Sequence, residues 1–206
     1  MKFIKITVVL VLVLLLSSLQ TYASQQGPME TVRKATEEVI ALLTAPSLST
    51  PEKAVERRKQ ISATVRDLFD WEYMARAALS VHWKKRTAEE KKEFIELYKQ
   101  YIESIYFDRI ETYSGEKFSF DKEVIDKQYP DEAIVYVSFY PKNVATVKME
   151  FLLFDIDREW KVYDVVAEGI SITANNAPQF NSIINEKSYD ELLKILKEKI
   201  DTSTPK

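Results

Sequence analysis

The chain has 206 residues, 12% of them aromatic, and a formal net charge of −3. This length suits a single domain with a substantial core, whereas the acidic balance disfavours a nucleic-acid partner, because neutralising phosphates requires clustered Lys and Arg. With three glycines and no cysteine, the sequence excludes a glycine-rich phosphate loop, disulfides and thiol chemistry.

The amino terminus has the pattern of a secretory signal peptide. Two lysines flank the start of the apolar run Ile6–Leu16, and small polar residues follow it up to a cleavage site after Ala23. The apolar run is short for a membrane span, which makes a membrane anchor the less favoured alternative. We therefore expect residues 1–23 to be removed and residues 24–206 to form a single domain in a periplasm.

The first half of the mature chain predicts four helices. Pro51 fits the first turn of one, Asp70 can cap another, and Thr87 with Glu90 forms a capping box for the longest. Apolar residues recur at helical spacing in all four. The basic run Glu56–Lys59 is expected to be an ordinary solvated face. The expected ranges are Pro28–Leu43, Pro51–Leu68, Asp70 to about Lys84–Arg86, and Thr87–Ser114, with Gly115 ending the last helix.

The second half predicts an antiparallel meander followed by two helices. Alternating and apolar runs are separated by turns rich in Pro, Asp and Asn. Helices first, a sheet second and helices last indicate an α+β domain. We expect helices wrapped around a curved antiparallel sheet of about four strands, which resembles the NTF2-like cone with an apolar cavity. The expected strands are Phe118–Gln128, Ala133–Tyr140, Val144–Ile156 and Trp160–Glu168; the expected helices open at Asn175–Pro178 and Ser188–Glu191.

The third predicted strand carries more apolar residues than a sheet covered on one side requires. Met149, Phe151 and Leu153 share one face, and from Leu152 onward the opposite face also turns apolar, through Phe154. We interpret the sheet as one wall of an apolar space that holds a ligand; ordinary core packing is the alternative for each residue. The predicted lining consists of Ile102, Tyr106, Val135, Val137, Phe139, Val147, Met149, Phe151, Leu153, Val162 and Val166.

Catalytic groups are scarce. His82 is the only histidine and is expected to pack beside Trp83 as a structural residue, so neither a zinc site nor a catalytic triad is expected. One enzyme hypothesis remains, in which Asp164 acts as a general base of isomerase or hydratase type in an apolar pocket. The favoured alternative is that Asp164 pairs with Arg109 or Lys161, or caps backbone groups.

Several ordered segments carry the signatures of a known family. These segments are Phe69–Leu79, His82-Trp83, Phe107–Gly115, Trp160–Ser171 and Gln179-Phe180 with the terminal helix. Together they resemble the MlaC family, also called the toluene-tolerance auxiliary family, over essentially the whole mature chain. One departure is that Asn176-Ala177-Pro178 stands where the family commonly has an aromatic–basic pair, so a role of that pair in partner docking cannot be carried over.

The resemblance implies a soluble, monomeric periplasmic phospholipid carrier that catalyses no reaction and needs no cofactor or metal. Its partners would be an outer-membrane lipoprotein–porin complex and an inner-membrane ABC transporter with an MCE-domain protein. Burying two acyl chains of about fifteen carbons is worth on the order of 20 kcal/mol, so such a carrier needs a deep, dry cavity. A cavity-free adaptor protein is the third hypothesis.

Overall fold

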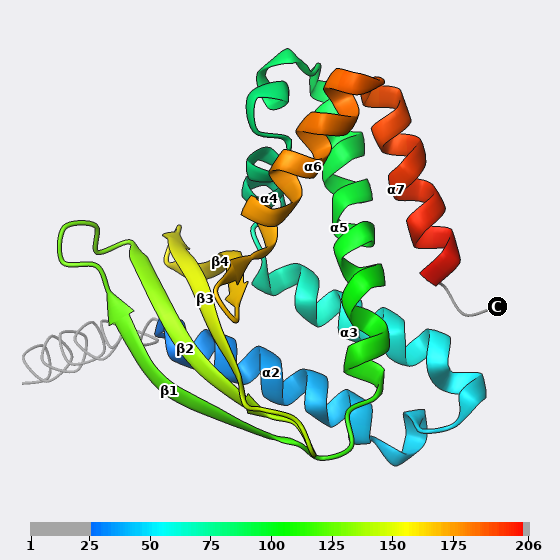
Figure 1. Ribbon diagram of the computed structural model, residues 1–206. Helices are drawn as coiled ribbons and strands as arrows, with labels where there is room; N and C mark the ends of the chain where they lie inside the picture. The colour runs from blue at the N-terminus through cyan, green and yellow to red at the C-terminus, as the bar shows by residue number, and fades with distance from the viewer. Residues whose placement is uncertain (1–25, 204–206) are drawn as a thin grey trace, which may run out of the picture.

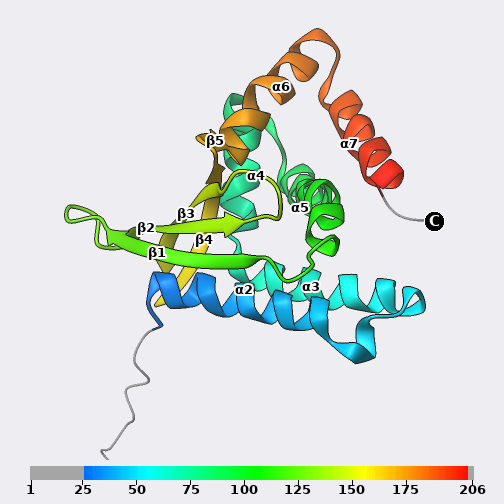
Figure 2. The same ribbon diagram turned by 60° about the horizontal axis from the view of Figure 1, so that its bottom comes forward.

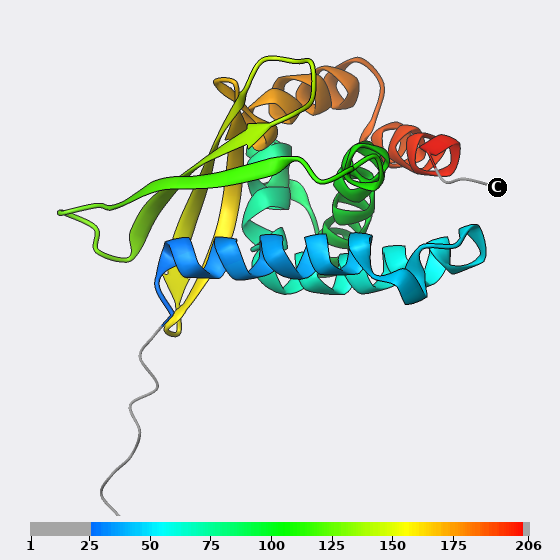
Figure 3. The ribbon, with the colours of Figure 1, turned by 90° about the horizontal axis from the view of Figure 1, so that it is seen from below.

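The computed structural model describes residues 26–203, apart from the side chains of Asp108 and Arg109. The predicted signal peptide, residues 1–23, lies outside this range. Helices α2 (Pro28–Thr44) and α3 (Ala54–Leu68) come first, joined by the short 3-10 turns η1 (Pro46–Leu48) and η2 (Pro51–Lys53). The two helices pack side by side along one side of the molecule (Figures 2 and 3).

Helix α4 (Trp71–Leu79) begins where the sequence predicts, because the Asp70 carboxylate accepts a hydrogen bond from the backbone N–H of Tyr73 at 2.9 Å. Its α-helical part ends earlier than expected. Ser80 adopts a φ of 50°, and the chain continues to Lys85 as the 3-10 helix η3 (Ser80–Lys85). The expectation of one continuous helix to Lys84–Arg86 is therefore wrong in its last turn and a half.

The longest helix, α5 (Ala88–Glu111), starts at the predicted capping box. The Glu90 N–H donates to Thr87 Oγ1 at 3.2 Å, and the Thr87 N–H donates to Glu90 Oε2 at 2.8 Å. The helix ends three residues before the predicted Ser114. Gly115 does take the left-handed conformation, with a φ of 93°, but in the loop beyond the helix.

Two arginines anchor the carboxyl end of α5 to α3. Arg57 and Arg58 donate to the two oxygens of Glu111, at 3.2 and 2.5 Å, and Arg57 also donates to the carbonyl of Leu48 at 2.6 Å. Both guanidinium groups are largely shielded from solvent. The expectation that Glu56–Lys59 is an ordinary solvated face is thus wrong for the two arginines, because both bind the carboxylate of Glu111.

The predicted meander is confirmed. Five strands form one antiparallel sheet in the order β1-β2-β3-β4-β5, which is curved and not closed (Figure 1). A two-residue fifth strand is added to the four expected. The strands are β1 (Lys117–Ile125), β2 (Glu132–Tyr140), β3 (Val147–Ile156), β4 (Glu159–Ala167) and β5 (Ile170–Ser171). Helices and an antiparallel sheet in this order establish the expected α+β class.

Helix α6 (Ile172–Glu186) begins earlier than predicted. The Ser171 hydroxyl caps it by accepting from the N–H of Ala174 at 3.0 Å. The stretch Asn175–Pro178, interpreted as the opening of a short helix, therefore lies inside α6, where the exposed Pro178 is accommodated. Helix α7 (Tyr189–Ser203) follows, with Ser188 at its start as expected.

The interior consists of two hydrophobic clusters. The helical cluster lies among α4, α5, α6 and α7, where Phe94, Tyr98 and Phe180 pack with ring centroids about 6 Å apart. The sheet cluster lies between the sheet and Val32 of α2. Figure 1 shows the corresponding halves, with the sheet on one side and the α5–α7 helices on the other. Among residues 26–203, no helix is both long and apolar enough to cross a membrane.

Candidate functional site

The strand register defines an inner face of the sheet, meaning the side that packs toward α2. Residues opposite each other on neighbouring strands point to the same side, so Val135, Phe151 and Val165 form one row across β2, β3 and β4. The row that pairs Val137 with Met149 lies next to it. The apolar inner-face residues are Phe118, Phe120, Ile125, Ala133, Val135, Val137, Phe139, Val147, Met149, Phe151, Leu153, Trp160, Val162, Val165 and Ala167, and the acidic residues Glu123 and Asp155 share this face.

Burial differs along this face. Val135, Leu153 and Val162 have no exposed surface, whereas Met149 and Phe151 in the middle of β3 are only half-buried. The helices that pack against the sheet do so mainly at its flanks: α2 against β1 and β2, and α3, α4 and α6 against β4. A central strand facing helices is normally well covered. The protein's own side chains therefore leave the apolar middle of β3 incompletely covered.

The two predicted lining residues on α5 belong to the other cluster. Ile102 is buried in the helical cluster, and Tyr106 packs against it while remaining half-buried. Phe69 and Ile172 are half-buried and pack against both clusters. Sequence reasoning assigned neither residue to the site, because each lies at the end of a helix or strand and breaks the periodic pattern. These two side chains connect the inner face with the helical half of the molecule.

Val166 does not share the inner face, and this part of the predicted lining must be corrected. A β-bulge in β4 places an extra residue between Val162, which pairs with Leu153, and Asp164, which pairs with Leu152. The bulge inverts the alternation beyond it, so Val165 turns inward and Val166 outward. The lining predicted from the sequence therefore omits Val165. The predicted lining also omits Phe118 and Phe120, although their spacing of two residues indicates that both lie on one face of β1.

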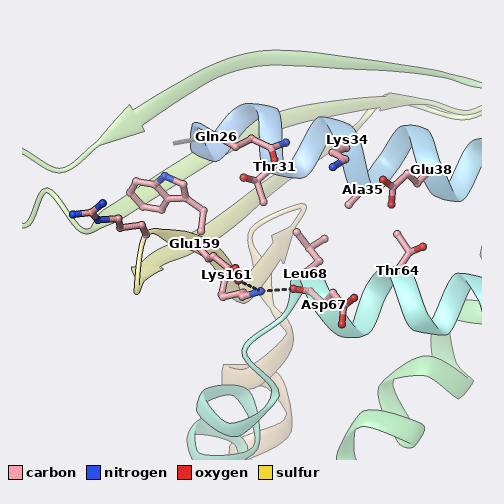
Figure 4. Close-up of a pocket in the computed structure, with 12 residues that line it drawn as sticks. Gln26, Thr31, Lys34, Ala35, Glu38, Thr64, Asp67, Leu68, Glu159 and Lys161 are labelled. Atoms are coloured by element: carbon pink, nitrogen blue, oxygen red, sulfur yellow. Dashed lines mark hydrogen bonds and ion pairs between the residues drawn. The ribbon is translucent and has the colours of Figure 1, made fainter. Parts of the chain in front are cut away.

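None of the predicted lining residues contributes to either of two surface pockets of about 410 Å³ each, and of the inner-face residues only Trp160 lines one of them. One is framed by α2, α3 and the β3–β4 turn (Figure 4). Lys161 crosses it, donating to the carbonyl of Asp67 at 2.8 Å and pairing with Glu159 at 2.9 Å. Lys34 and Glu38 add further charges to its wall. Such a lining is unsuited to hydrocarbon chains.

Asp164, the candidate general base, is buried and saturated with hydrogen bonds. Its Oδ1 accepts from the N–H groups of Val165 at 2.9 Å and Thr173 at 3.2 Å, while its Oδ2 accepts from the hydroxyls of Ser171 and Thr173. Four donors occupy the four acceptor positions of a carboxylate. Asp164 thus holds the turn from β4 into α6, in agreement with the capping alternative; the side chain of Arg109 lies outside the described part.

The single histidine is also structural. His82 is 4% exposed, and its Nε2 lies 2.9 Å from Oδ1 of Asn181, a contact that joins η3 to α6. Within residues 26–203, the acidic side chains and His82 form no group of three or more that could hold a metal ion. Asp164 and His82 therefore serve a helix cap and a contact between elements, respectively.

The fold and the inner face together define an α+β protein in which a curved, open sheet turns a largely apolar face toward helices. The same fold is found in a solved structure of a phospholipid-binding protein from Ralstonia solanacearum, in complex with a phospholipid. The match has a TM-score of 0.73 at 17% sequence identity and covers 85% of this chain and 98% of that one.

A family model described as MlaC protein matches residues 33–198, and the chain belongs to this family. The chain is also 25% identical, over 127 residues, to the intermembrane phospholipid transport system binding protein MlaC of Haemophilus influenzae. That alignment covers 59% of this chain and 58% of the length of the relative.

Proposed function

We propose that this protein is a phospholipid-binding carrier of an intermembrane lipid transport system. The observation that carries the proposal is the half-buried apolar middle of the inner face, at Met149 and Phe151. A central strand of this composition needs an apolar cover, and acyl chains supply one. The proposal is further supported by membership of the MlaC family and by a structural neighbour that holds a phospholipid.

The energetics favour acyl chains as the part of the ligand that is held. Each methylene removed from water contributes about 0.8 kcal/mol, so the affinity of such a carrier is set mainly by the apolar area it offers. The inner face, together with Ile102 and Tyr106 of α5, is the predicted contact surface. The phosphate head group remains in solvent, because burying its charge without paired cations is costly.

The proposal extends to compartment and partners. The amino-terminal signal peptide predicted from the sequence would deliver the protein to the periplasm as a monomer. There it would exchange lipid with an inner-membrane ABC transporter carrying an MCE-domain protein and with an outer-membrane lipoprotein–porin complex. No covalent chemistry is required of it. The enzyme alternative depended on Asp164, whose four hydrogen bonds leave no lone pair for a general base.

Native mass spectrometry of the mature protein, purified from the periplasm of a bacterial host, tests this function. We expect a species heavier than the polypeptide by the mass of one diacyl phospholipid, which collision activation removes. The same protein, once delipidated, should take up lipid from vesicles. A clean mass of the polypeptide alone, with no uptake from vesicles of several head-group compositions, would contradict the proposal.

A further inference from the structure

Helices α3 and α5 are joined mainly through polar side chains. The Ser62 hydroxyl of α3 donates to Oε1 of Glu103 on α5 at 2.7 Å. Further along, Arg57 and Arg58 donate to Glu111 at 3.2 and 2.5 Å. The backbones of α3 and α5 approach each other less closely than those of α2 and α3 or of α5 and α7, so the contact depends on side chains that span the distance. We call these five residues the α3–α5 polar contact.

The other boundaries between the sheet and the helices around it are largely apolar. Beside β4 and β5, Phe69 and Ile172 pack against both hydrophobic clusters, and Val65 of α3, one turn before Phe69, packs against the helical cluster. Beside β1, Met29 of α2 packs against the sheet cluster. Separating apolar surfaces exposes them to water, whereas separated polar groups exchange their partners for water at little net cost. The α3–α5 polar contact is therefore the boundary that opens most easily.

This polar contact borders the surface predicted to hold the lipid. Tyr106 and Ile102, the predicted lipid contacts on α5, lie about 60° and about 100° around the helix axis from Glu103. On this side, the loop 112–116 connects α5 to β1 and carries Gly115 in the left-handed conformation. A movement of α5 away from α3 would therefore uncover the lipid-facing side of α5 and the space between it and the inner face.

We propose that acyl chains enter and leave the space in front of the inner face between α3 and α5, and that the α3–α5 polar contact closes this entrance; the inference rests on the proposed carrier function. A carrier must let its ligand pass without unfolding its own core. Breaking the hydrogen bonds of Ser62 to Glu103, and of the two arginines to Glu111, leaves both hydrophobic clusters intact, and water solvates each freed polar group.

Cross-linking tests the entrance, because the chain has no cysteine of its own. The double variant Ser62→Cys/Glu103→Cys would be loaded with a fluorescent phospholipid and joined by a short, reducible bis-methanethiosulfonate. Transfer to vesicles should fall to the rate of spontaneous transfer without carrier, and should recover on reduction. Glu93→Cys/Lys197→Cys is the matched control, since Lys197 pairs with Glu93 at 3.1 Å between α5 and α7; its cross-linking should leave the rate unchanged.

A single substitution tests the same closure without a cross-link and decides the outcome if the double variant fails to fold. Ser62→Ala removes one hydrogen bond of the closure, so lipid release should be about five-fold faster, the factor for one ordinary hydrogen bond. Ser104→Ala is its control, because the Ser104 hydroxyl donates to the Tyr101 carbonyl of its own helix at 2.8 Å, and should leave the release rate unchanged.

Two results overturn the inference. One is transfer at the uncross-linked rate by the cross-linked Ser62→Cys/Glu103→Cys protein, and the other is an unchanged release rate in a folded Ser62→Ala protein. A wild-type protein that takes up no phospholipid contradicts the carrier function itself, so failure of the entrance and failure of the carrier function are distinguishable.

Discussion

Replacing Phe151 with glutamate distinguishes between two interpretations of the inner face, an open apolar surface and a solid core. Phe151 lies on the inner face in the middle of β3, paired with the fully buried Val135 and with Val165, and is itself half-buried. In the lipid-free protein a glutamate there can turn its carboxylate toward water. In the lipid-bound protein the same carboxylate would lie against hydrocarbon.

The free-energy cost of the glutamate differs among the lipid-bound protein, the lipid-free protein and a solid core. A carboxylate placed against acyl chains costs about 3 kcal/mol on the insertion scale for charged residues in a bilayer, which corresponds to a loss of lipid affinity of roughly 100-fold. In the lipid-free protein the main loss is the packing of part of one ring, about 1–2 kcal/mol. In a solid core, by contrast, the unpaired charge would lower the free energy of unfolding by more than about 4 kcal/mol.

Two assays measure these quantities: lipid retention by native mass spectrometry, and the free energy of unfolding by urea denaturation of the delipidated protein. Ile134→Glu is the matched control, since Ile134 is also half-buried but lies on the opposite face, where it pairs with Leu152. Phe151→Glu should lose its lipid and remain folded, and Ile134→Glu should keep its lipid. Wild-type lipid retention in Phe151→Glu would mean that Phe151 does not contact the lipid, and a collapse of its stability would mean that Phe151 lies in a solid core.

Four further predictions concern three other residues. Asp164→Asn should transfer lipid at the wild-type rate in a vesicle assay, and a complete loss of transfer by a folded variant would revive the enzyme hypothesis. Asp164→Ala should lower the free energy of unfolding by about 2–4 kcal/mol, measured in urea, because the N–H and hydroxyl of Thr173 lose their buried acceptor. Thr87→Ala should remove about 1 kcal/mol, seen as a fall of roughly 2–4 °C in the melting temperature followed by circular dichroism; no fall would mean that the capping box contributes nothing. The hydrogen bond from Arg58 lowers the pKa of Glu111, so the stabilisation from this carboxylate is complete above its unfolded-state pKa of about 4.3 and is lost as the pH falls through the lower folded-state value. The stability difference between wild type and Glu111→Gln should therefore shrink between pH 7 and pH 3 in urea titrations, and a constant difference would contradict the assignment.

The sequence was sufficient for features that rest on periodicity or on a local cap. Alternation in β2 and β3 predicted the meander and most of the inner face, including Val135, Met149 and Phe151. The capping box at Thr87 predicted the start of α5, because its hydrogen bonds join residues only three positions apart. Such signals need no knowledge of distant contacts.

Features that depend on tertiary contacts were not predictable in this way. The β4 bulge leaves no mark in the run of apolar residues, yet it exchanges Val165 for Val166 on the inner face. The hydrogen bonds from Arg57 and Arg58 to Glu111 join positions more than fifty residues apart.

Photo-crosslinking shows directly whether the inner face of the sheet holds the acyl chains. The mature protein would be loaded with a phospholipid that carries a diazirine midway along one acyl chain, irradiated, digested and sequenced by mass spectrometry. We expect adducts on the inner-face residues of β3, from Met149 to Leu153, and on α5 near Ile102 and Tyr106. Adducts confined to the charged pocket between α2 and α3, or to the outer face around Ile134, would contradict it.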